Sequence, residues 1–368
     1  MVTAKGVRAG INPAPTHRTP APTYTTMMTI KNMIHRMAFL VLGIGTLTAC
    51  SSTDPSVEDG HVVRMPIVLA IPANNAELTI GSTGAKATRA EGDPGTYEQF
   101  KLPTHLYIYL LNTSIDGSET NVLKPEGMDD KNGYTLKTDK WTKTTTQDNN
   151  KDSIYTYTDQ IRIIIPENRS EGVVYAAMST VPITVTYTGT TVDEATFTLG
   201  TEASGKESEA LKNLYSSPCN LTKDSKYYGI VNDYKSNSPY INMVLYHVAS
   251  KLDVQWNVDA TVQSSVKLSK ITLTKLSGGG KLFKPLENTE SSSTYSETFT
   301  LDAGSQWYGR KATYVIPVKQ SDGTYQFPMT LTNSVSNSDK TKTATATPSS
   351  DKTVFVPWIY GTVKVTQW

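Results

Sequence analysis

Five histidines and two cysteines are the side chains that could bind a metal or act as strong nucleophiles, and their spacing supports neither role. Only His105 and His247 follow Arg89, and neither belongs to a His-Glu-x-x-His or paired Cys-x-x-Cys pattern. The chain has no Gly-x-Ser-x-Gly elbow, and the glycine-rich stretch 276–281 lacks the Ser or Thr that completes a phosphate-binding loop. We therefore expect no catalytic residue, metal or cofactor, and no enzymatic activity.

Cys50 is the one side chain whose surroundings favour a reaction. A basic stretch that includes Lys31 and Arg36 precedes an apolar run over 37–47, and the run ends at Leu-Thr-Ala-Cys50. The run is shorter than the roughly 20 apolar residues that cross a bilayer, and its basic flank is typical of a secretory signal. Cysteine after Leu-Thr-Ala is similar to the bacterial lipobox, whose thiol is acylated with fatty acids such as palmitate. The alternative is a buried helix that carries a cysteine.

These features predict an order of segments at the amino-terminal end. Residues 1–26 are rich in Pro, Thr and Ala, and we interpret them as an over-extended start that lies outside the fold. Residues 27–49 are expected to be the lipoprotein signal peptide. The exported precursor would then begin at Cys50 and reside at the outer membrane.

Composition excludes several function classes. The 368 residues include 35 Lys and Arg against 34 Asp and Glu, so no basic surplus is available for binding nucleic acid. Apolar residues make up 38% of the chain and charged residues 19%, which fits a folded protein and not a disordered one. Tyr outnumbers Phe by 20 to 7, which favours a secreted β-protein with hydrated surfaces.

An alternating apolar segment follows the tether after Cys50. Its pattern predicts a strand with one buried face, and Pro66 within it predicts a position at a sheet edge, because proline cannot donate to a strand ladder. The residues expected on the buried face are Val63, Met65, Ile67, Leu69 and Ile71.

Arg89 lies in a stretch of small and polar residues over 81–95, and it is the only arginine between Arg64 and Arg162. An arginine-specific protease could cut such an exposed linker between Arg89 and Ala90. The alternative is that Arg89 is an ordinary solvated surface charge.

From Phe100 onward, short strands recur every ten to fifteen residues, with one short helix predicted at 206–215. A polar, turn-rich stretch at 223–239 suggests a domain boundary, after which a second set of strands begins at Tyr240. We expect an all-β protein with two tandem β-sandwiches. The predicted divisions are a propeptide over 50–89, an N-terminal sandwich over 90–235 and a C-terminal sandwich over 236–368.

The order of these features resembles the FimA/Mfa-type fimbrillins of Bacteroidales, the subunits of type V pili. The resemblance rests on the lipobox, the alternating strand, the Thr-Arg-Ala linker, the segment Val244-Leu-Tyr-His-Val-Ala-Ser-Lys-Leu-Asp-Val254 and the closing Val363-Lys-Val-Thr-Gln-Trp368. It spans essentially the whole stretch from Cys50 onward.

The resemblance implies transthyretin-like sandwiches and a structural role in a fimbrium that contributes to adhesion at the cell surface. After an arginine-specific protease cuts at Arg89, the strand with Val63 to Ile71 would leave and expose an apolar groove. A C-terminal strand of a neighbouring subunit would fill it, giving a head-to-tail polymer. Four apolar residues share a face of this donor strand: Phe355, Ile359, Val363 and Val365.

In a second hypothesis, the chain keeps its lipid and forms no polymer. The chain would then be an anchored surface protein that binds a glycan or a host or bacterial surface protein. Aromatic side chains such as Trp141, Trp256 and Trp307 could form such a binding surface, although they pack cores at least as often.

Overall fold

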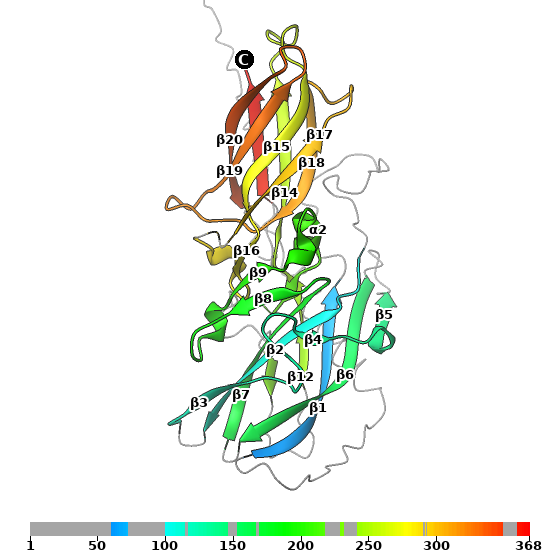
Figure 1. The fold of residues 1–368 in the computed structure, drawn as a ribbon, viewed down its shortest axis with the longest axis vertical. Coiled ribbons are helices and arrows are strands. Elements are labelled where there is room, and N and C mark those ends of the chain that lie inside the picture. Colours follow the sequence, from blue (N-terminus) through cyan, green and yellow to red (C-terminus); the bar gives the residue numbers. More distant parts are fainter. Residues whose placement is uncertain are drawn as a thin grey trace, which may run out of the picture. The chain divides into compact units, whose positions relative to one another are not determined.

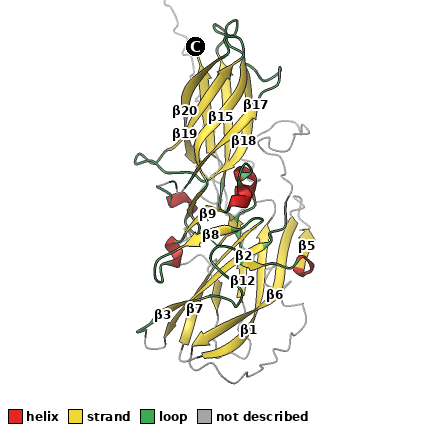
Figure 2. Cartoon of the chain, in the orientation of Figure 1, coloured by secondary structure: helices red, strands yellow, loops and turns green. Residues whose placement is uncertain are grey.

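The computed structural model describes ten ranges of the chain. They are 60–72, 100–114, 117–145, 153–166, 169–217, 229–231, 241–289, 291, 293–348 and 359–368. Strands dominate these residues, which confirms the all-β fold class (Figures 1 and 2). None of the helices in this part of the chain combines the length and apolar character needed to cross a lipid bilayer.

The N-terminal sandwich consists of two sheets with an apolar core between them. The first sheet has the order β12 (Ile241–Val244), β1 (Gly60–Pro72), β6 (Ser153–Pro166) and β5 (Trp141–Thr145). The second has the order β13 (Tyr246–His247), β10 (Tyr215–Ser216), β7 (Arg169–Ser179), β2 (His105–Ser114) and β3 (Thr120–Leu123). Two short strands extend the second sheet, β11 (Gly229–Val231) beside β7 and β4 (Tyr134–Thr135) beside β2.

The second sheet is buried on both faces, which explains why β2 is apolar or aromatic at successive positions. Leu106 and Ile108 face the core of the sandwich, whereas Tyr107 and Tyr109 face a separate apolar cluster on the opposite side. A small sheet of β8 (Ile183–Thr186), β9 (Thr196–Leu199) and β16 (Gly279–Lys281) contributes to that cluster. Tyr314 and Ile316, which follow much later in the chain, also belong to it.

The C-terminal sandwich is one seven-stranded sheet whose strands surround a single core. In spatial order the strands are β17 (Thr294–Thr300), β15 (Leu268–Ser277), β19 (Tyr325–Asn333), β20 (Ser338–Pro348), β21 (Ile359–Val365), β14 (Ser250–Val258) and β18 (Tyr308–Val315). Among the described residues, β20 and β21 pair over Ala346–Pro348 and Ile359–Gly361. The sheet therefore divides into two layers at this short contact.

Helical structure is limited to short pieces among the described residues. The predicted helix is present as α2 (Glu207–Lys212), shorter than expected, with Ala210 and Leu211 buried. Four 3₁₀ turns complete the set: η1 (Thr138–Lys140), η2 (Val192–Glu194), η3 (Thr201–Ala203) and η4 (Pro285–Glu287).

The boundary between the two strand sets differs from the predicted division at residue 236. β12 pairs with β1 and β13 pairs with β10, so both belong to the N-terminal sandwich. The C-terminal sheet begins at Ser250. Sequence alone placed the boundary too early because alternation of apolar residues continues through 243–258 and does not reveal where the chain changes sheets.

Candidate functional site

β1 is the longest continuous apolar alternation at the amino-terminal side of Arg89, and the structure makes it an interior strand. All 13 of its residues pair with β6 in antiparallel register, from Gly60 opposite Pro166 to Pro72 opposite Ile154. On its other side, residues 67–70 pair with β12 in parallel register. The predicted edge position is therefore wrong for this half of the strand. Pro66 lies immediately before the first residue paired with β12, where its missing N–H interrupts no pairing with that strand.

The predicted buried face of β1 is confirmed. Met65, Ile67, Leu69 and Ile71 are each 0% exposed, and Val63 packs at the margin of the same core. Because each side chain of this size stabilises a fold by about 1.5–3 kcal/mol when it is buried, the four together account for a large share of the sandwich's stability. Without β1, a long apolar groove would open between β6 and β12. We call this space the β1 groove, whether or not β1 occupies it.

Two layers of side chains line the β1 groove. Alternate residues of β6 and β12 form its sides, and inward residues of β2 and β7 form its floor. The main contributors are Tyr157, Ile161, Ile163, Ile165, Leu106, Ile108, Leu110, Val174, Ala176, Met178, Ile241 and Met243. A replacement strand must run antiparallel to β6 and parallel to β12 to restore both sets of pairings.

One polar pair interrupts this apolar lining. Asp159 lies opposite Ile67 and Tyr157 lies opposite Leu69, and the Tyr157 hydroxyl donates a hydrogen bond to Asp159 Oδ2 at 3.0 Å. Burial raises the pKa of the Tyr157 hydroxyl above its ordinary value, and the nearby Asp159 carboxylate raises it further. Lys137 Nζ lies 3.7 Å from the same carboxylate. The groove can thus hold an apolar strand while its wall remains hydrogen-bonded.

The outer face of β1 carries a like-charge contact. Arg64 is directly opposite Arg162 across the β1–β6 ladder, an arrangement that destabilises a strand pair. Arg162 is compensated by Glu126, with Nε and Oε2 3.2 Å apart. The inner face therefore holds β1 strongly, whereas its outer face places like charges opposite each other, which Glu126 offsets on the Arg162 side.

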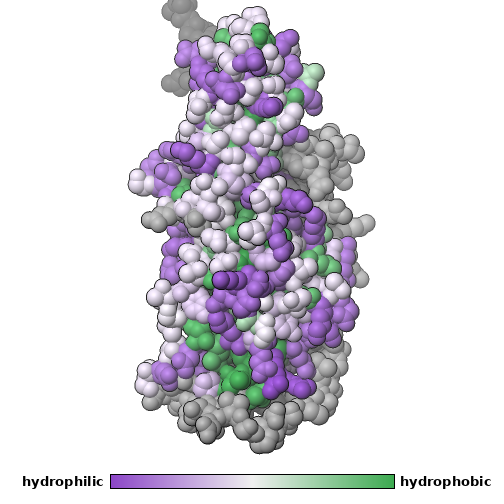
Figure 3. All heavy atoms as spheres, in the orientation of Figure 1, coloured by the Kyte–Doolittle hydropathy of each residue, from purple (hydrophilic) through white to green (hydrophobic). Residues whose placement is uncertain are grey.

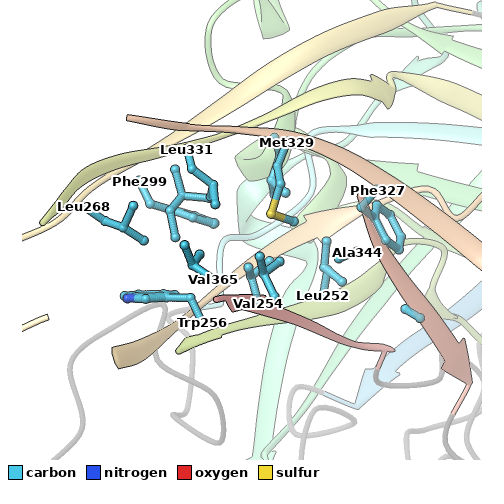
Figure 4. Packing of buried hydrophobic residues seen from close by; sticks show 14 of the residues in the cluster. Leu252, Val254, Trp256, Leu268, Phe299, Phe327, Met329, Leu331, Ala344 and Val365 are labelled. Atoms are coloured by element: carbon cyan, nitrogen blue, oxygen red, sulfur yellow. The ribbon is translucent and has the colours of Figure 1, made fainter. Parts of the chain in front are cut away.

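The predicted donor residues lie partly within the C-terminal core. Val363 is 4% exposed and Val365 is 0% exposed, and Figure 4 shows Val365 among Val254, Trp256 and Phe299. Ile359 is the first residue of β21, which lies between β14 and β20. Transfer of β21 to another copy would consequently open the core of its own sandwich. Phe355 lies outside the described residues.

Three other predicted site residues, Cys50, Arg89 and Ala90, also lie outside the described residues. Acylation and cleavage therefore stay predictions. The described chain resumes at Phe100, so the segment that contains Arg89 joins the end of β1 to the residues that precede β2.

The tryptophans named for the binding hypothesis pack against the cores. Trp256 is 3% exposed, and its indole N–H donates to the Ser305 carbonyl at 2.8 Å. Trp307 packs on the C-terminal core and donates to the Val266 carbonyl at 3.0 Å. Trp141 contacts Tyr157 edge to face, with ring centroids 5.3 Å apart. These side chains therefore pack against the two cores.

Sequence reasoning missed several groove residues. Ile241 and Met243 flank β1 although about 170 residues separate them from it in the chain, and their apolar alternation was attributed to the second domain. Phe100 and Tyr155, which stack at one end of β1, carried no signal in the sequence beyond being aromatic.

No family model and no curated protein matches the chain. Several solved structures from Bacteroides are weakly similar. A candidate cell adhesion protein from Bacteroides eggerthii aligns with 9% identity and a TM-score of 0.37, covering 83% of this chain and 87% of its own. A candidate adhesin from Bacteroides ovatus aligns with 9% identity and a TM-score of 0.36, covering 82% and 88%. A candidate polysaccharide-binding protein from Bacteroides thetaiotaomicron aligns with 8% identity and a TM-score of 0.32, covering 75% and 78%. Similarity at this level does not establish a common function, so the proposals below depend on the chain's own residues.

Proposed function

We propose that the chain is a structural subunit of an adhesive surface fibre, exported as a lipoprotein acylated at Cys50. After cleavage at Arg89, its N-terminal sandwich releases β1 and accepts a strand from a neighbouring copy. The observation that carries the proposal is the placement of β1. It is an interior strand with four fully buried side chains, yet it precedes Arg89, so cleavage there removes its covalent connection to the remainder of the sandwich.

The cost of an empty groove supports polymer formation. Exposure of the apolar lining to water is unfavourable, and the unpaired edges of β6 and β12 would attract another strand. Strand addition at such an edge supplies backbone hydrogen bonds, while alternate side chains supply selectivity. A contact between the groove of one copy and the C-terminal strand of another is head-to-tail, and such a contact gives a filament when it does not close on itself.

The proposed donor is the neighbour's C-terminal segment with Phe355, Ile359, Val363 and Val365. β21 has the same pattern of neighbours as β1, one parallel strand and one antiparallel strand. A strand from this segment could therefore satisfy the directions that the β1 groove requires. Val363 and Val365 are buried in their own sandwich, so their transfer to another copy exposes that core and has a free-energy cost. Dilution of the released β1 fragment would favour the exchange against this cost, because β1 could then no longer rebind.

A second function is favoured by one specific observation. Before cleavage, both β1 and β21 occupy interior positions in the sandwiches of their own chain, so the uncut chain is complete as a monomer. An anchored surface lipoprotein that binds a glycan or a surface protein would have this form.

The test is the amino terminus of the native protein on its own cell surface, measured by intact mass and terminal sequencing. Fibre subunits that begin at Ala90 support the fibre proposal, and the Arg89→Ala variant should then fail to polymerise while it remains folded. Fibres built from chains that begin at acylated Cys50 would refute release of β1. A chain that begins at Cys50 and forms no high-mass species supports the anchored binding protein.

To identify the donor, one cysteine is introduced at Ile161 on β6, a groove wall that remains after cleavage, and another at Val363 in separate copies, which are cut at Arg89 and mixed. A disulfide between the two copies supports the C-terminal donor, and Ile161→Cys paired with the exposed position Thr362→Cys is the matched control. Polymers without the first disulfide would exclude β21 as the donor.

A further inference from the structure

A cluster of aromatic rings closes the β1 groove at the Ile71 end. The ring of Phe100 stacks on Tyr155 with centroids 4.0 Å apart and an interplanar angle of 16°. The ring of Phe100 is also 6.0 Å from the ring of Tyr215, which is only 2% exposed. Tyr155 belongs to β6 and Tyr215 to β10, so Phe100 bridges the two sheets of the N-terminal sandwich.

This cluster lies directly in line with β1. Tyr155 is the cross-strand partner of Ile71. It lies on the same face of β6 as Tyr157 and Ile161, the face toward the core. Phe100 packs at the margin of the same apolar core that contains Ile71. We call the rings of Phe100, Tyr155 and Tyr215 the aromatic wall. Ile71 is the last inward-facing residue of β1, so a side chain at its position lies next to this wall.

The wall is held in place from both sandwiches. Tyr215 packs on His247 with ring centroids 4.6 Å apart, and His247 lies 6.1 Å from Tyr314 on β18. The backbone beside Phe100 is fixed as well, because the Thr104 N–H donates to the Ser179 carbonyl at 2.9 Å and Lys101 forms an ion pair with Glu209. Movement of Phe100 would disturb this whole row of contacts.

Phe100 and β1 lie on opposite sides of Arg89 in the chain. Cleavage there leaves Phe100 attached to β2 and separates β1 from both. The aromatic wall thus remains when β1 departs, and it faces whichever strand enters next.

We propose that Phe100 is the register stop of the β1 groove: it sets how far an incoming strand can advance and limits the size of the side chain at its leading inner position. This inference depends on the proposed exchange of β1. A shift by one residue would turn every apolar side chain of the incoming strand outward, so a fixed stop selects one register.

The experiment uses the full chain, cut at Arg89 while folded, and a fluorescently labelled peptide with the sequence of residues 60–72. Competing peptides carry Ile71→Phe, at the stop, or Met65→Phe, far from it. Phe100 is changed to Leu and, in a second variant, to Ala, so that at least one smaller side chain is tested in a folded protein. Leu102→Ala, an exposed position nearby, is the matched protein control.

With Phe100 present, the Ile71→Phe peptide should bind at least tenfold more weakly than the unmodified peptide. This discrimination should fall below threefold in the Phe100 variants, because the smaller side chain leaves room for the added ring. Discrimination against Met65→Phe should be unchanged in all the proteins. A simple loss of stability would weaken every peptide alike and could not produce this selective rescue.

Two failures are distinguishable. If no peptide enters the cut protein and β1 never dissociates, strand exchange itself is refuted, and the register stop with it. If peptides exchange normally but the Phe100 variants still reject Ile71→Phe as strongly as the parent, only the register stop is refuted.

Discussion

β1 and β21 occupy corresponding positions in the two sandwiches, and the comparison shows what each groove can accept. Each strand lies between one parallel and one antiparallel neighbour. β1 has its long contact with the antiparallel neighbour β6, whereas β21 has its long contact, over Ile359–Val365, with the parallel neighbour β14. Antiparallel pairing is slightly more stable per residue, so β1 is the more strongly paired strand along its backbone.

The inner faces of the two strands differ in size. β1 buries Met65, Ile67, Leu69 and Ile71, whereas the described inner positions of β21 are Gly361, Val363 and Val365. A β21 strand in the β1 groove would therefore leave unfilled volume, which destabilises a core in proportion to the cavity that remains. The corresponding directions are compatible with strand exchange, and the unequal volumes make the chain's own β1 the better fit for its groove.

The largest expected effect on stability comes from a change in β1. Leu69→Ala removes a fully buried side chain from the centre of the groove and should lower the free energy of unfolding by about 2–5 kcal/mol. Urea denaturation measures the loss, and hydrogen exchange should place it in β6 and not in β14. Val68→Ala, on the outer face, is the control and should cost much less. Equal losses for the two variants would mean that the inner face does not hold β1.

The second largest expected effect on stability comes from a change in β21. A Cβ at Gly361 would lie 3.2 Å from the Ala344 Cβ, where β20 and β21 separate into two layers. Gly361→Val should therefore overpack this contact and destabilise the C-terminal sandwich by about 1–3 kcal/mol. Thermal unfolding monitored by near-ultraviolet circular dichroism checks the loss, with Thr362→Val at an exposed position as the control. An unchanged midpoint would show that β21 is loosely packed against β20.

A smaller effect sharpens the contrast between the two faces of β1. Arg64→Thr removes the like charge opposite Arg162 and should stabilise the β1–β6 ladder by about 0.2–1 kcal/mol. In the cut protein, this change should slow the dissociation of β1, measured by size-exclusion chromatography of the released fragment. Arg64→Lys retains the charge and should behave like the parent. The gain should shrink at high salt, and a gain independent of salt would exclude the electrostatic cause.

The smallest effect concerns pH and is centred on β17 of the C-terminal sandwich. Burial raises the pKa of Glu297 on β17, and the negative charge of Glu207 raises it further. The folded state therefore binds a proton at a higher pH than the unfolded chain, so stability should increase as pH falls through the raised pKa toward the ordinary value near 4.5.

Glu297→Gln should remove this increase and stabilise the protein at pH 7 by a few tenths of a kcal/mol, because Glu297 is only half buried. Denaturant midpoints at several pH values measure the slope, and Glu207→Gln should reduce it in part. A slope that is unchanged in both variants would contradict the assignment.

Local patterns in the sequence predicted β1 well, because alternation of apolar residues reports directly which face of a strand is buried. They predicted its surroundings poorly. The pairing of Ile67 with Ile241 depends on residues far apart in the chain, and no local pattern encodes such a pairing. For the same reason Pro66 suggested an edge, although the parallel partner begins only at the next residue.

The donor strand shows a different limit of sequence reasoning. Val363 and Val365 share a face, as predicted, but alternation does not distinguish a strand that fills its own core from one that fills a neighbour's. Phe100 illustrates the reverse case, because a single aromatic residue outside any strand has no periodicity. Only its stacking on Tyr155 and its contact with Tyr215 reveal its position.

The double burial of the sheet that contains β2 has a consequence for the order in which the protein folds. One of its faces is completed by Phe283, Tyr314 and Ile316, and the neighbouring sheet is completed by β12. A chain that crosses a membrane from its amino terminus would deliver β1, β2, β6 and β7 well before these partners arrive. Such distant pairings slow folding, and the waiting strands expose apolar surface. The first sandwich to emerge would thus be among the last to be finished.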